Sequence, residues 1–189
     1  MLLTITTPEQ FKQVPWKNGK GVTAELAINE GADMSNFAWR ISKACVVEDG
    51  PFSFFPGYTR HLVLLEGAGI DLIIGDQSLT LNKPLDIAVF DGAQSTSGRL
   101  HQGAITDFNV IFNPLLCNME TRSFTQDSQF TLTPPNEYFI YAAHTAISVH
   151  SDEGLSQTQT IAAGCLVHVS ELHHAATVHG ECLIVIRKY

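Results

Sequence analysis

The chain has 189 residues, with 11 Lys and Arg against 19 Asp and Glu, and its net charge of −8 argues against nucleic acid as a partner. No window approaches the roughly 20 apolar residues of a membrane span, and the N-terminus lacks the basic flank of a signal peptide. We therefore expect a cytoplasmic protein that binds neither nucleic acid nor membrane and keeps its four cysteines reduced.

The predicted elements are almost all short strands. Residues 7–12 can hold one helical turn, capped by Thr7 and with Pro8 at its first position. The segments that follow alternate apolar and polar side chains, and turn signals interrupt them about every 8–12 residues. The predicted strands cover residues 37–47, 52–55, 60–65, 70–74, 78–81, 84–90, 106–112, 124–126, 137–142, 146–150, 157–161, 164–169, 176–178 and 182–187.

This rhythm predicts an all-β fold of two small barrels. The first series of strands ends near Pro114, and the second begins near Phe124. We predict an N-terminal barrel over residues 1–115 that carries a ligand pocket. A second barrel over residues 116–189 packs with it as one unit. No residue-level repeat links the two halves, so the duplication is inferred from the strand rhythm.

Residues 15–26 mix chemistry that core packing does not require. They hold an aromatic ring, two cations, an amide, a hydroxyl and a carboxylate, and Gly19 and Gly21 permit unusual backbone angles. We expect this stretch and the later polar stretches to converge on one pocket.

Arg40 belongs to the strand predicted over residues 37–47. Alternation places Arg40, Ser42 and Ala44 on one face of that strand and Trp39 on the other. If Ala44 faces a barrel interior, Arg40 does too, and a buried cation needs a carboxylate or an anionic ligand as its partner. The alternative is an arginine on the solvent face. For the tryptophans, the alternative to a pocket wall is packing in the core.

Arg60 opens the most apolar strand of the chain, and Glu66 ends that strand before a glycine. The planar guanidinium of Arg60 suits a carboxylate or a phosphate. Alternatively, Arg60 lies at a rim and bonds backbone carbonyls, and Glu66 is an ordinary turn residue. Asp107 and Asn109 share one face of an otherwise apolar strand, so both need polar partners, which a nearby cation can supply.

Motifs for metal binding and catalysis are missing from the sequence. Six of the eight histidines follow residue 140, but none forms an HxH pair, and no CxxC, GxSxG, GxGxxG or P-loop pattern occurs. We predict no metal, no cofactor and no catalytic residue.

The polar stretches occur in a definite order. They are Pro-Trp-Lys-Asn-Gly-Lys-Gly-Val-Thr-Ala-Glu at 15–25, Trp-Arg-Ile-Ser at 39–42, Asp-Gly-Pro-Phe-Ser-Phe-Phe-Pro-Gly at 49–57, Arg60, Leu-Leu-Glu-Gly at 64–67, Phe-Asp-Gly at 90–92 and Asp-Phe-Asn at 107–109. In this order they resemble the HutD/Ves family of bacterial proteins. The second half of the chain matches that family only in length and β character.

The resemblance implies an RmlC-like cupin fold with two β-barrels, or jelly rolls, in one chain (a bicupin), the second of them degenerate. It implies a regulatory or ligand-sensing role linked to histidine utilisation or, in the Ves branch, to stress. No enzymatic activity is established for the family. The ligand type that it suggests is an acidic product of histidine breakdown, such as formylglutamate.

Two departures bear on the pocket. Lys20 stands where the family usually has a glycine, so the pocket is more basic or that position faces solvent. A metal-binding cupin carries HxH near residues 58–62, where this chain has only His61, and no histidine lies near residues 95–97 at the second expected position. We therefore expect arginine and lysine, rather than a metal, to supply the positive charge.

Three hypotheses follow. We favour a non-enzymatic protein that binds a small anionic metabolite, with a regulatory role. The alternatives are a metal-independent isomerase or hydrolase that acts on such an acid, and an interaction module whose polar residues satisfy one another. A homodimer through exposed strand edges is also open. The predicted ligand-binding residues are Trp16, Lys17, Asn18, Thr23, Glu25, Trp39, Arg40, Ser42, Phe54, Arg60, Glu66, Asp107 and Asn109.

Overall fold

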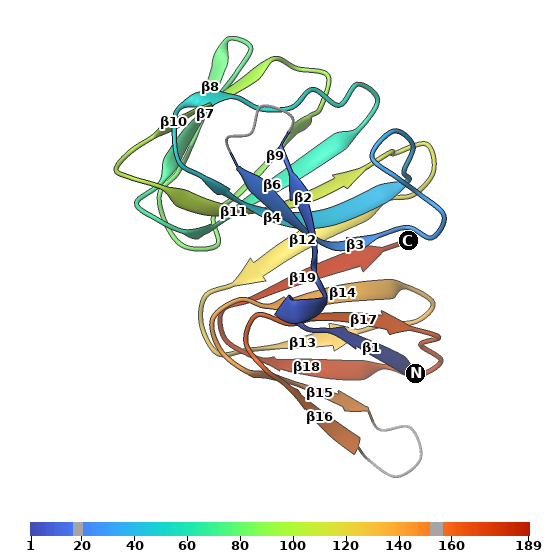
Figure 1. Ribbon diagram of the computed structural model, residues 1–189. Coiled ribbons are helices and arrows are strands. Elements are labelled where there is room, and N and C mark those ends of the chain that lie inside the picture. Colours follow the sequence, from blue (N-terminus) through green and yellow to red (C-terminus); the bar gives the residue numbers. More distant parts are fainter. Residues whose placement is uncertain (17–20, 152–156) are drawn as a thin grey trace. The chain divides into compact units, whose positions relative to one another are not determined.

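The computed structural model describes residues 1–16, 21–151 and 157–189 (Figure 1). Its regular elements are antiparallel β-strands and one 3-10 turn, η1 (Pro8–Gln10), so the predicted all-β fold is confirmed. The predicted turn lies where it was expected. The Gln10 amide donates to the Thr7 carbonyl at 2.9 Å, and the Thr7 amide donates to Gln10 Oε1 at 2.8 Å.

The chain divides into two compact units. One comprises Phe11–Asn118, and the other comprises Met1–Gln10 together with Met119–Tyr189. We call them the N-terminal barrel and the C-terminal barrel. The sequence analysis assigned residues 1–10 to the first barrel, but the first strand pairs with a strand of the second. Strand pairing between segments far apart in the chain is not visible in local periodicity.

The N-terminal barrel consists of two sheets. A six-stranded sheet has the order β2-β3-β4-β11-β6-β9, and a four-stranded sheet has the order β5-β10-β7-β8. The strands are β2 (Lys12–Pro15), β3 (Val22–Ile28), β4 (Trp39–Val46), β5 (Gly50–Pro51), β6 (Thr59–Glu66), β7 (Ile70–Ile74), β8 (Gln77–Leu81), β9 (Ile87–Asp91), β10 (Thr96–Leu100) and β11 (Ile105–Phe112).

The C-terminal barrel also has two sheets. A five-stranded sheet has the order β1-β17-β14-β19-β12, and a four-stranded sheet has the order β13-β18-β15-β16. The strands are β1 (Leu2–Thr6), β12 (Met119–Phe124), β13 (Ser128–Leu132), β14 (Glu137–Ala142), β15 (Ile147–Ser151), β16 (Gln157–Ile161), β17 (Leu166–Ser170), β18 (Ala176–Gly180) and β19 (Leu183–Lys188).

The two barrels repeat one topology. The order β4-β11-β6-β9 with β5-β10-β7-β8 becomes β12-β19-β14-β17 with β13-β18-β15-β16 when each strand number rises by eight. Eight antiparallel strands in two facing sheets form a jelly roll. The duplication inferred from strand rhythm is therefore confirmed at the level of strand order.

Each barrel has its own apolar core. In the N-terminal barrel, Leu62 and Leu64 alternate along β6 and are fully buried with Ile70 and Leu72. In the C-terminal barrel, Ile140 and its neighbours form the corresponding cluster. Because burial of each such side chain contributes about 1.5–3 kcal/mol, these alternate positions determine which face of a strand turns inward.

Equivalent rows of residues cross the larger sheet of each barrel. In the N-terminal barrel, β11 Ile111 pairs with β4 Arg40 and with β6 Arg60. In the C-terminal barrel, β19 Arg187 pairs with β12 Glu120 and with β14 Tyr138. Arg40 and Arg60 are the second residues of β4 and β6, and Glu120 and Tyr138 are the second residues of β12 and β14. The two rows therefore occupy the same place in the jelly roll.

Candidate functional site

A cluster of buried polar side chains lies on the six-stranded sheet of the N-terminal barrel. Its members lie on β3, β4, β6 and β11, and none is more than 8% exposed. The cluster, called here the inner polar group, consists of Glu25, Arg40, Ser42, Arg60, Asp107 and Asn109. Since alternate residues of a strand share a face, the same alternation that buries the leucines of β6 turns these side chains inward.

Arg40 and Glu25 form a closed ion pair within this group. Arg40 Nε donates to Glu25 Oε2 at 2.7 Å. Lys12 Nζ lies 3.9 Å from the other carboxylate oxygen, but its side chain is 76% exposed. Arg40 therefore has an internal carboxylate as its direct partner.

Arg60 has a different environment. Its Nη1 donates to the Ser53 carbonyl at 3.0 Å and its Nη2 donates to Asn109 Oδ1 at 3.1 Å. Asn109 Nδ2 in turn donates to Asp107 Oδ1 at 2.8 Å. The Nε–H of Arg60 is buried and has no acceptor among the described residues. Both acceptors of the guanidinium are neutral, and the Asp107 carboxylate, which is bonded to Asn109, acts on Arg60 through its charge.

Three aromatic rings surround the Arg60 guanidinium. Its Cζ lies 5.4, 5.5 and 5.1 Å from the ring centroids of Phe52, Phe55 and Phe90. Each ring is within the distance at which a cation is attracted to an aromatic face. The rings also exclude water, so the charge of Arg60 has a weakly polar environment.

Burial shifts the pKa values of both Asp107 and Arg60. It raises the pKa of Asp107 to about 6, although the charge of Arg60 and the Asn109 hydrogen bond oppose that rise. It lowers the pKa of Arg60 to about 10, and the charge of Asp107 again opposes the change. At neutral pH, Arg60 is thus a cation, and Asp107 changes charge just below neutrality.

Two residues of the first polar stretch, Trp16 and Thr23, are bonded to each other next to the inner polar group. Trp16 Nε1 donates to Thr23 Oγ1 at 2.8 Å, and Thr23 pairs with Ala44, which pairs with Asp107. A Cβ at Gly21 would lie 2.9 Å from the Trp16 ring, so a larger residue there would displace the indole. The predicted residues Lys17 and Asn18, and also Lys20, lie outside the described residues.

Besides Trp16 and Thr23, three predicted residues lie outside the inner polar group. Trp39 precedes Arg40 on β4, so strand alternation turns it to the opposite face. Phe54 is 62% exposed, because the segment between β5 and β6 is irregular and does not continue the alternation of a strand. Glu66 is exposed and accepts a bond from Thr106 Oγ1 at 3.3 Å. Six residues of strand place Glu66 about 20 Å from Arg60.

The sequence analysis missed the rings around Arg60. It listed Phe54 among the ligand-binding residues, whereas the rings that lie near the Arg60 guanidinium are those of Phe52, Phe55 and Phe90. The run of four residues with three phenylalanines was a signal that aromatic rings gather here. Which of them faced Arg60 depended on the backbone of an irregular segment.

Metal ligands do not converge in the described part of the chain. No group of three His, Cys, Asp or Glu side chains there is close enough to hold a metal ion. His61 follows Arg60 on β6 and lies on its opposite face. Burial lowers the pKa of His61 to about 4, so the ring is neutral at physiological pH. The positively charged members of the inner polar group are Arg40 and Arg60.

No described helix is long and apolar enough to cross a membrane.

Together, the repeated jelly roll and the charged residues inside one barrel define a double-barrel protein of the cupin fold class. A cupin 2 conserved barrel domain protein from Leptotrichia buccalis matches 92% of the chain and 91% of its own length, with a TM-score of 0.53. It is 10% identical, so this likeness concerns the fold alone.

Within this class, the chain belongs to the HutD family. The family model matches residues 8–185, so the family match extends through the second half, where the sequence analysis found agreement only in length and β character. HutD from Pseudomonas fluorescens SBW25, in the formate condition, is 26% identical with a TM-score of 0.82, and the match covers 99% of this chain and 98% of that one.

Two curated relatives are similar to this chain over a shorter stretch. The "uncharacterized 21.2 kDa protein in hutC 3′ region" of Pseudomonas putida is 38% identical over 112 residues, 59% of each chain. Protein Ves of Escherichia fergusonii is 34% identical over 108 residues, 57% of this chain and 56% of its own length. The chain thus spans less than two thirds of either relative. The first relative links the family to the histidine-utilisation region, and the resemblance noted in the sequence is confirmed.

Proposed function

We propose that the N-terminal barrel binds a small carboxylate, of the formylglutamate type, at the inner polar group. The protein is non-enzymatic in this proposal, and binding regulates histidine utilisation or a stress response. Family membership supports the link to histidine utilisation. The chemistry of one buried arginine supports the kind of ligand.

That arginine is Arg60, which is 4% exposed and touches only neutral acceptors, the Ser53 carbonyl and the Asn109 amide. Removing a cation from water is costly unless an anion compensates it at close range. Arg40 already has Glu25 in direct contact. Arg60 has no such partner among the described residues, and its Nε–H is unused. A ligand carboxylate in contact with Arg60 would supply the missing charge through a strong hydrogen bond.

Asp107 gives the proposed site a pH dependence. Because its raised pKa is about 6, the carboxyl is largely ionised at pH 7.5 and largely neutral at pH 5. When ionised, it competes with an anionic ligand for the charge of Arg60. We therefore expect the affinity for a carboxylate to rise as the pH falls from 7.5 to 5, and Asp107→Asn to abolish that rise.

Calorimetric titration of the whole chain with formate, acetate, glutamate and formylglutamate tests the proposal. One of these acids should bind, and Arg60→Ala should weaken it by about one to two orders of magnitude, since a hydrogen bond to a charged group contributes about 1.5–3 kcal/mol. A ligand at one hundred times its dissociation constant also stabilises the fold by about 2.7 kcal/mol, so thermal unfolding provides a second readout.

Two further variants keep this test interpretable. Arg60→Lys retains the charge but loses the planar fork, so it should still weaken binding if the alanine variant fails to fold. Arg99→Gln is the matched control, because Arg99 is exposed and pairs with Asp71 outside the inner polar group. If the Arg60 variants bind the acid as tightly as wild type does, Arg60 does not bind the ligand. For the regulatory role, growth on histidine should respond to Arg60→Lys and not to Arg99→Gln.

The alternative of a metal-independent hydrolase or isomerase gains support from Asp107. A general base acts best when its pKa lies near the working pH, and burial brings the pKa of Asp107 to about 6. Incubation of the same acids with the protein, followed by NMR, separates the two functions. Product that appears with wild type and is lost with Asp107→Asn would establish an enzyme, whereas bound but unchanged acid favours the binding protein.

A further inference from the structure

A second charged cluster lies in the C-terminal barrel, at the position that matches the inner polar group. Glu120, Arg187 and Tyr138 form the row across β12, β19 and β14 that corresponds to Arg40, Ile111 and Arg60. A cavity of about 320 Å³ opens there. That volume is at the lower end of the range for small-molecule sites.

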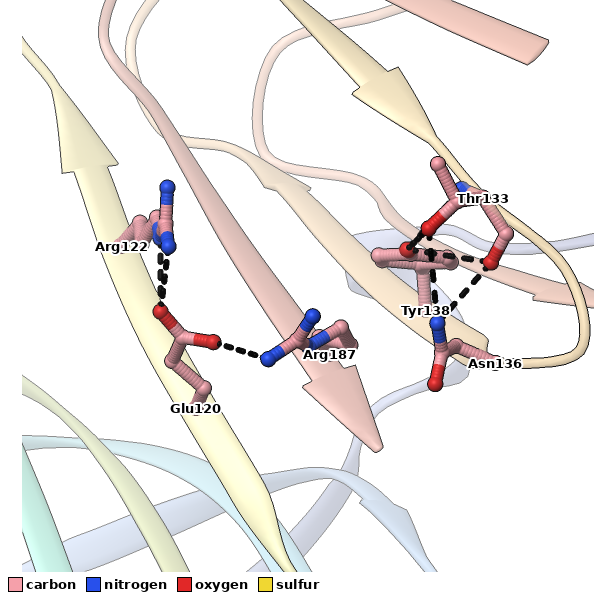
Figure 2. Close-up of polar contacts among 6 residues, drawn as sticks. All are labelled: Glu120, Arg122, Thr133, Asn136, Tyr138 and Arg187. Atoms are coloured by element: carbon pink, nitrogen blue, oxygen red, sulfur yellow. Dashed lines mark hydrogen bonds and ion pairs between the residues drawn. The ribbon is translucent and has the colours of Figure 1, made fainter. Parts of the chain in front are cut away.

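The cavity has an excess of positive charge. Arg122 Nε and Nη2 both lie 2.7 Å from Glu120 Oε1, and Arg187 Nη2 donates to Glu120 Oε2 at 2.6 Å. Figure 2 shows the carboxylate between the two guanidinium groups. Two cations thus share one anion. The hydrogen bond from Arg122, its largest influence, lowers the pKa of Glu120, so that carboxylate is ionised near neutral pH.

Several donors of the two arginines remain available. The described contacts with acceptors use Nε and Nη2 of Arg122 and Nη2 of Arg187. The Nε–H of Arg187 is buried and has no acceptor in the described part of the chain. The arginine side chains are 57% and 37% exposed, so a solute can reach them. The geometry that already holds one carboxylate suits a second one, or a replacement for the first.

Besides the charged residues and the threonines Thr131 and Thr133, the lining is aromatic and apolar. Phe130, Tyr138 and Val185 border the cavity. The Phe130 and Tyr138 rings meet at a centroid distance of 6.3 Å and an interplanar angle of 69°, and Arg122 Cζ lies 5.8 Å from the Phe130 centroid. Such walls favour an organic body over a bare inorganic ion.

A turn holds the Tyr138 wall in place. The Tyr138 hydroxyl accepts from the Thr133 amide at 3.0 Å, and Asn136 Nδ2 donates to the Thr133 carbonyl at 3.0 Å, as Figure 2 shows. Tyr138 is 1% exposed. Because its hydroxyl is engaged by the turn, Tyr138 supplies shape to the cavity, and the arginines supply the charge.

We propose that this cavity is a second binding site, for a small organic carboxylate with an aromatic or aliphatic body, which Arg122 and Arg187 hold against the Phe130 and Tyr138 rings. The site does not depend on the function proposed for the N-terminal barrel, since all of its residues belong to the C-terminal barrel.

Titration of the ¹⁵N-labelled whole chain, observed by NMR, tests this proposal with benzoate, acetate and phosphate at equal ionic strength. Benzoate should shift the amide signals of Thr131, Thr133 and Val185 at lower concentration than acetate or phosphate does. Signals around Arg60 report separately on the first site, so failure at one site is distinguishable from failure at the other. Equal responses to phosphate and benzoate would overturn the organic ligand, and no response at these amides would overturn the site.

Variants of the three charged residues sharpen the result. Arg187→Gln should weaken benzoate about tenfold or more, as expected for the loss of a charged hydrogen bond. Glu120→Gln should strengthen benzoate severalfold, because it removes the anion that competes for both arginines. Arg99→Gln and Arg60→Lys are the controls and should leave these amide shifts unchanged. A Glu120→Gln variant that binds benzoate more weakly than wild type would contradict the proposed competition.

Discussion

The two barrels place charged side chains at the same point of the same topology but expose them differently. In the N-terminal barrel, Arg40 and Arg60 are each 4% exposed. In the C-terminal barrel, the Arg122 and Arg187 side chains are 57% and 37% exposed. Sheet order provides the reason. β3 flanks β4 and adds Glu25 to the interior, whereas β12 is the edge of its sheet and the additional strand β1 lies at the opposite edge.

This difference shows that a similar ion pair can have two energetic roles. Arg40 Nε lies 2.7 Å from Glu25 Oε2, and Arg187 Nη2 lies 2.6 Å from Glu120 Oε2. An exposed pair contributes little to stability, because water and salt screen it. Breaking a buried pair leaves a charge without compensation. We therefore expect the N-terminal pair to be needed for folding and the C-terminal pair to be free to exchange partners.

The largest expected effect comes from breaking each pair by the same substitution. Arg40→Ala should lower the free energy of unfolding by about 3–5 kcal/mol, because Glu25 remains buried. Arg187→Ala should lower it by less than about 1 kcal/mol. Urea unfolding measures both. Tryptophan fluorescence follows the N-terminal barrel, which holds Trp16 and Trp39, and circular dichroism follows the whole chain. Similar losses for the two variants would contradict the comparison.

Asp107 provides a second test, based on pH. Its pKa is raised from 3.8 to about 6 in the folded chain, so the folded state holds the proton more tightly than the unfolded state. Stability from this group is therefore lost as the pH rises from about 4 to above 6, by about 3 kcal/mol for a shift of roughly two pKa units. Relative to wild type, Asp107→Asn should be more stable at pH 7.5 than at pH 4 by about that amount.

His61 titrates in the same range with the opposite sign. Burial lowers its pKa from 6.5 to about 4, so its contribution is lost as the pH falls through that window. The wild-type profile alone does not separate the two groups. The difference between wild type and Asp107→Asn, measured by urea unfolding at each pH, isolates the carboxyl. A difference that stays constant with pH would rule out the raised pKa.

The smallest expected effect concerns the aromatic rings around Arg60. A Cβ at Gly98 would lie 2.7 Å from Ile70 Cδ1 and 2.8 Å from a Phe52 ring carbon. Gly98→Ala should therefore destabilise the N-terminal barrel by about 1–3 kcal/mol through overpacking, and displace Phe52 from Arg60. Gly50 pairs with Gly98 and has open space at its Cβ, so Gly50→Ala is the control and should be near neutral in the same unfolding assay.

Much of the N-terminal site could be predicted because it follows strand alternation. Arg40 and Ser42 share a face with Ala44, and Asp107 shares a face with Asn109, as period two requires. Phe54 is exposed and lies outside the inner polar group because its segment is irregular, where no period applies. The C-terminal site was not predicted. Its arginines lie on β12 and β19, and nothing local indicates that these strands are neighbours.

The sequence by itself determined the all-β fold, the number of barrels and the family, because turn residues, alternation and ordered motifs are local properties of the chain. Only the tertiary structure decided which charges meet. Arg60 depends on Asn109, and Arg187 on Glu120, across 49 and 67 residues of sequence. Such contacts depend on strand order and register, which hydrogen bonds between distant strands establish. Burial then decides whether the same pair of charges stabilises the fold or remains available to a ligand.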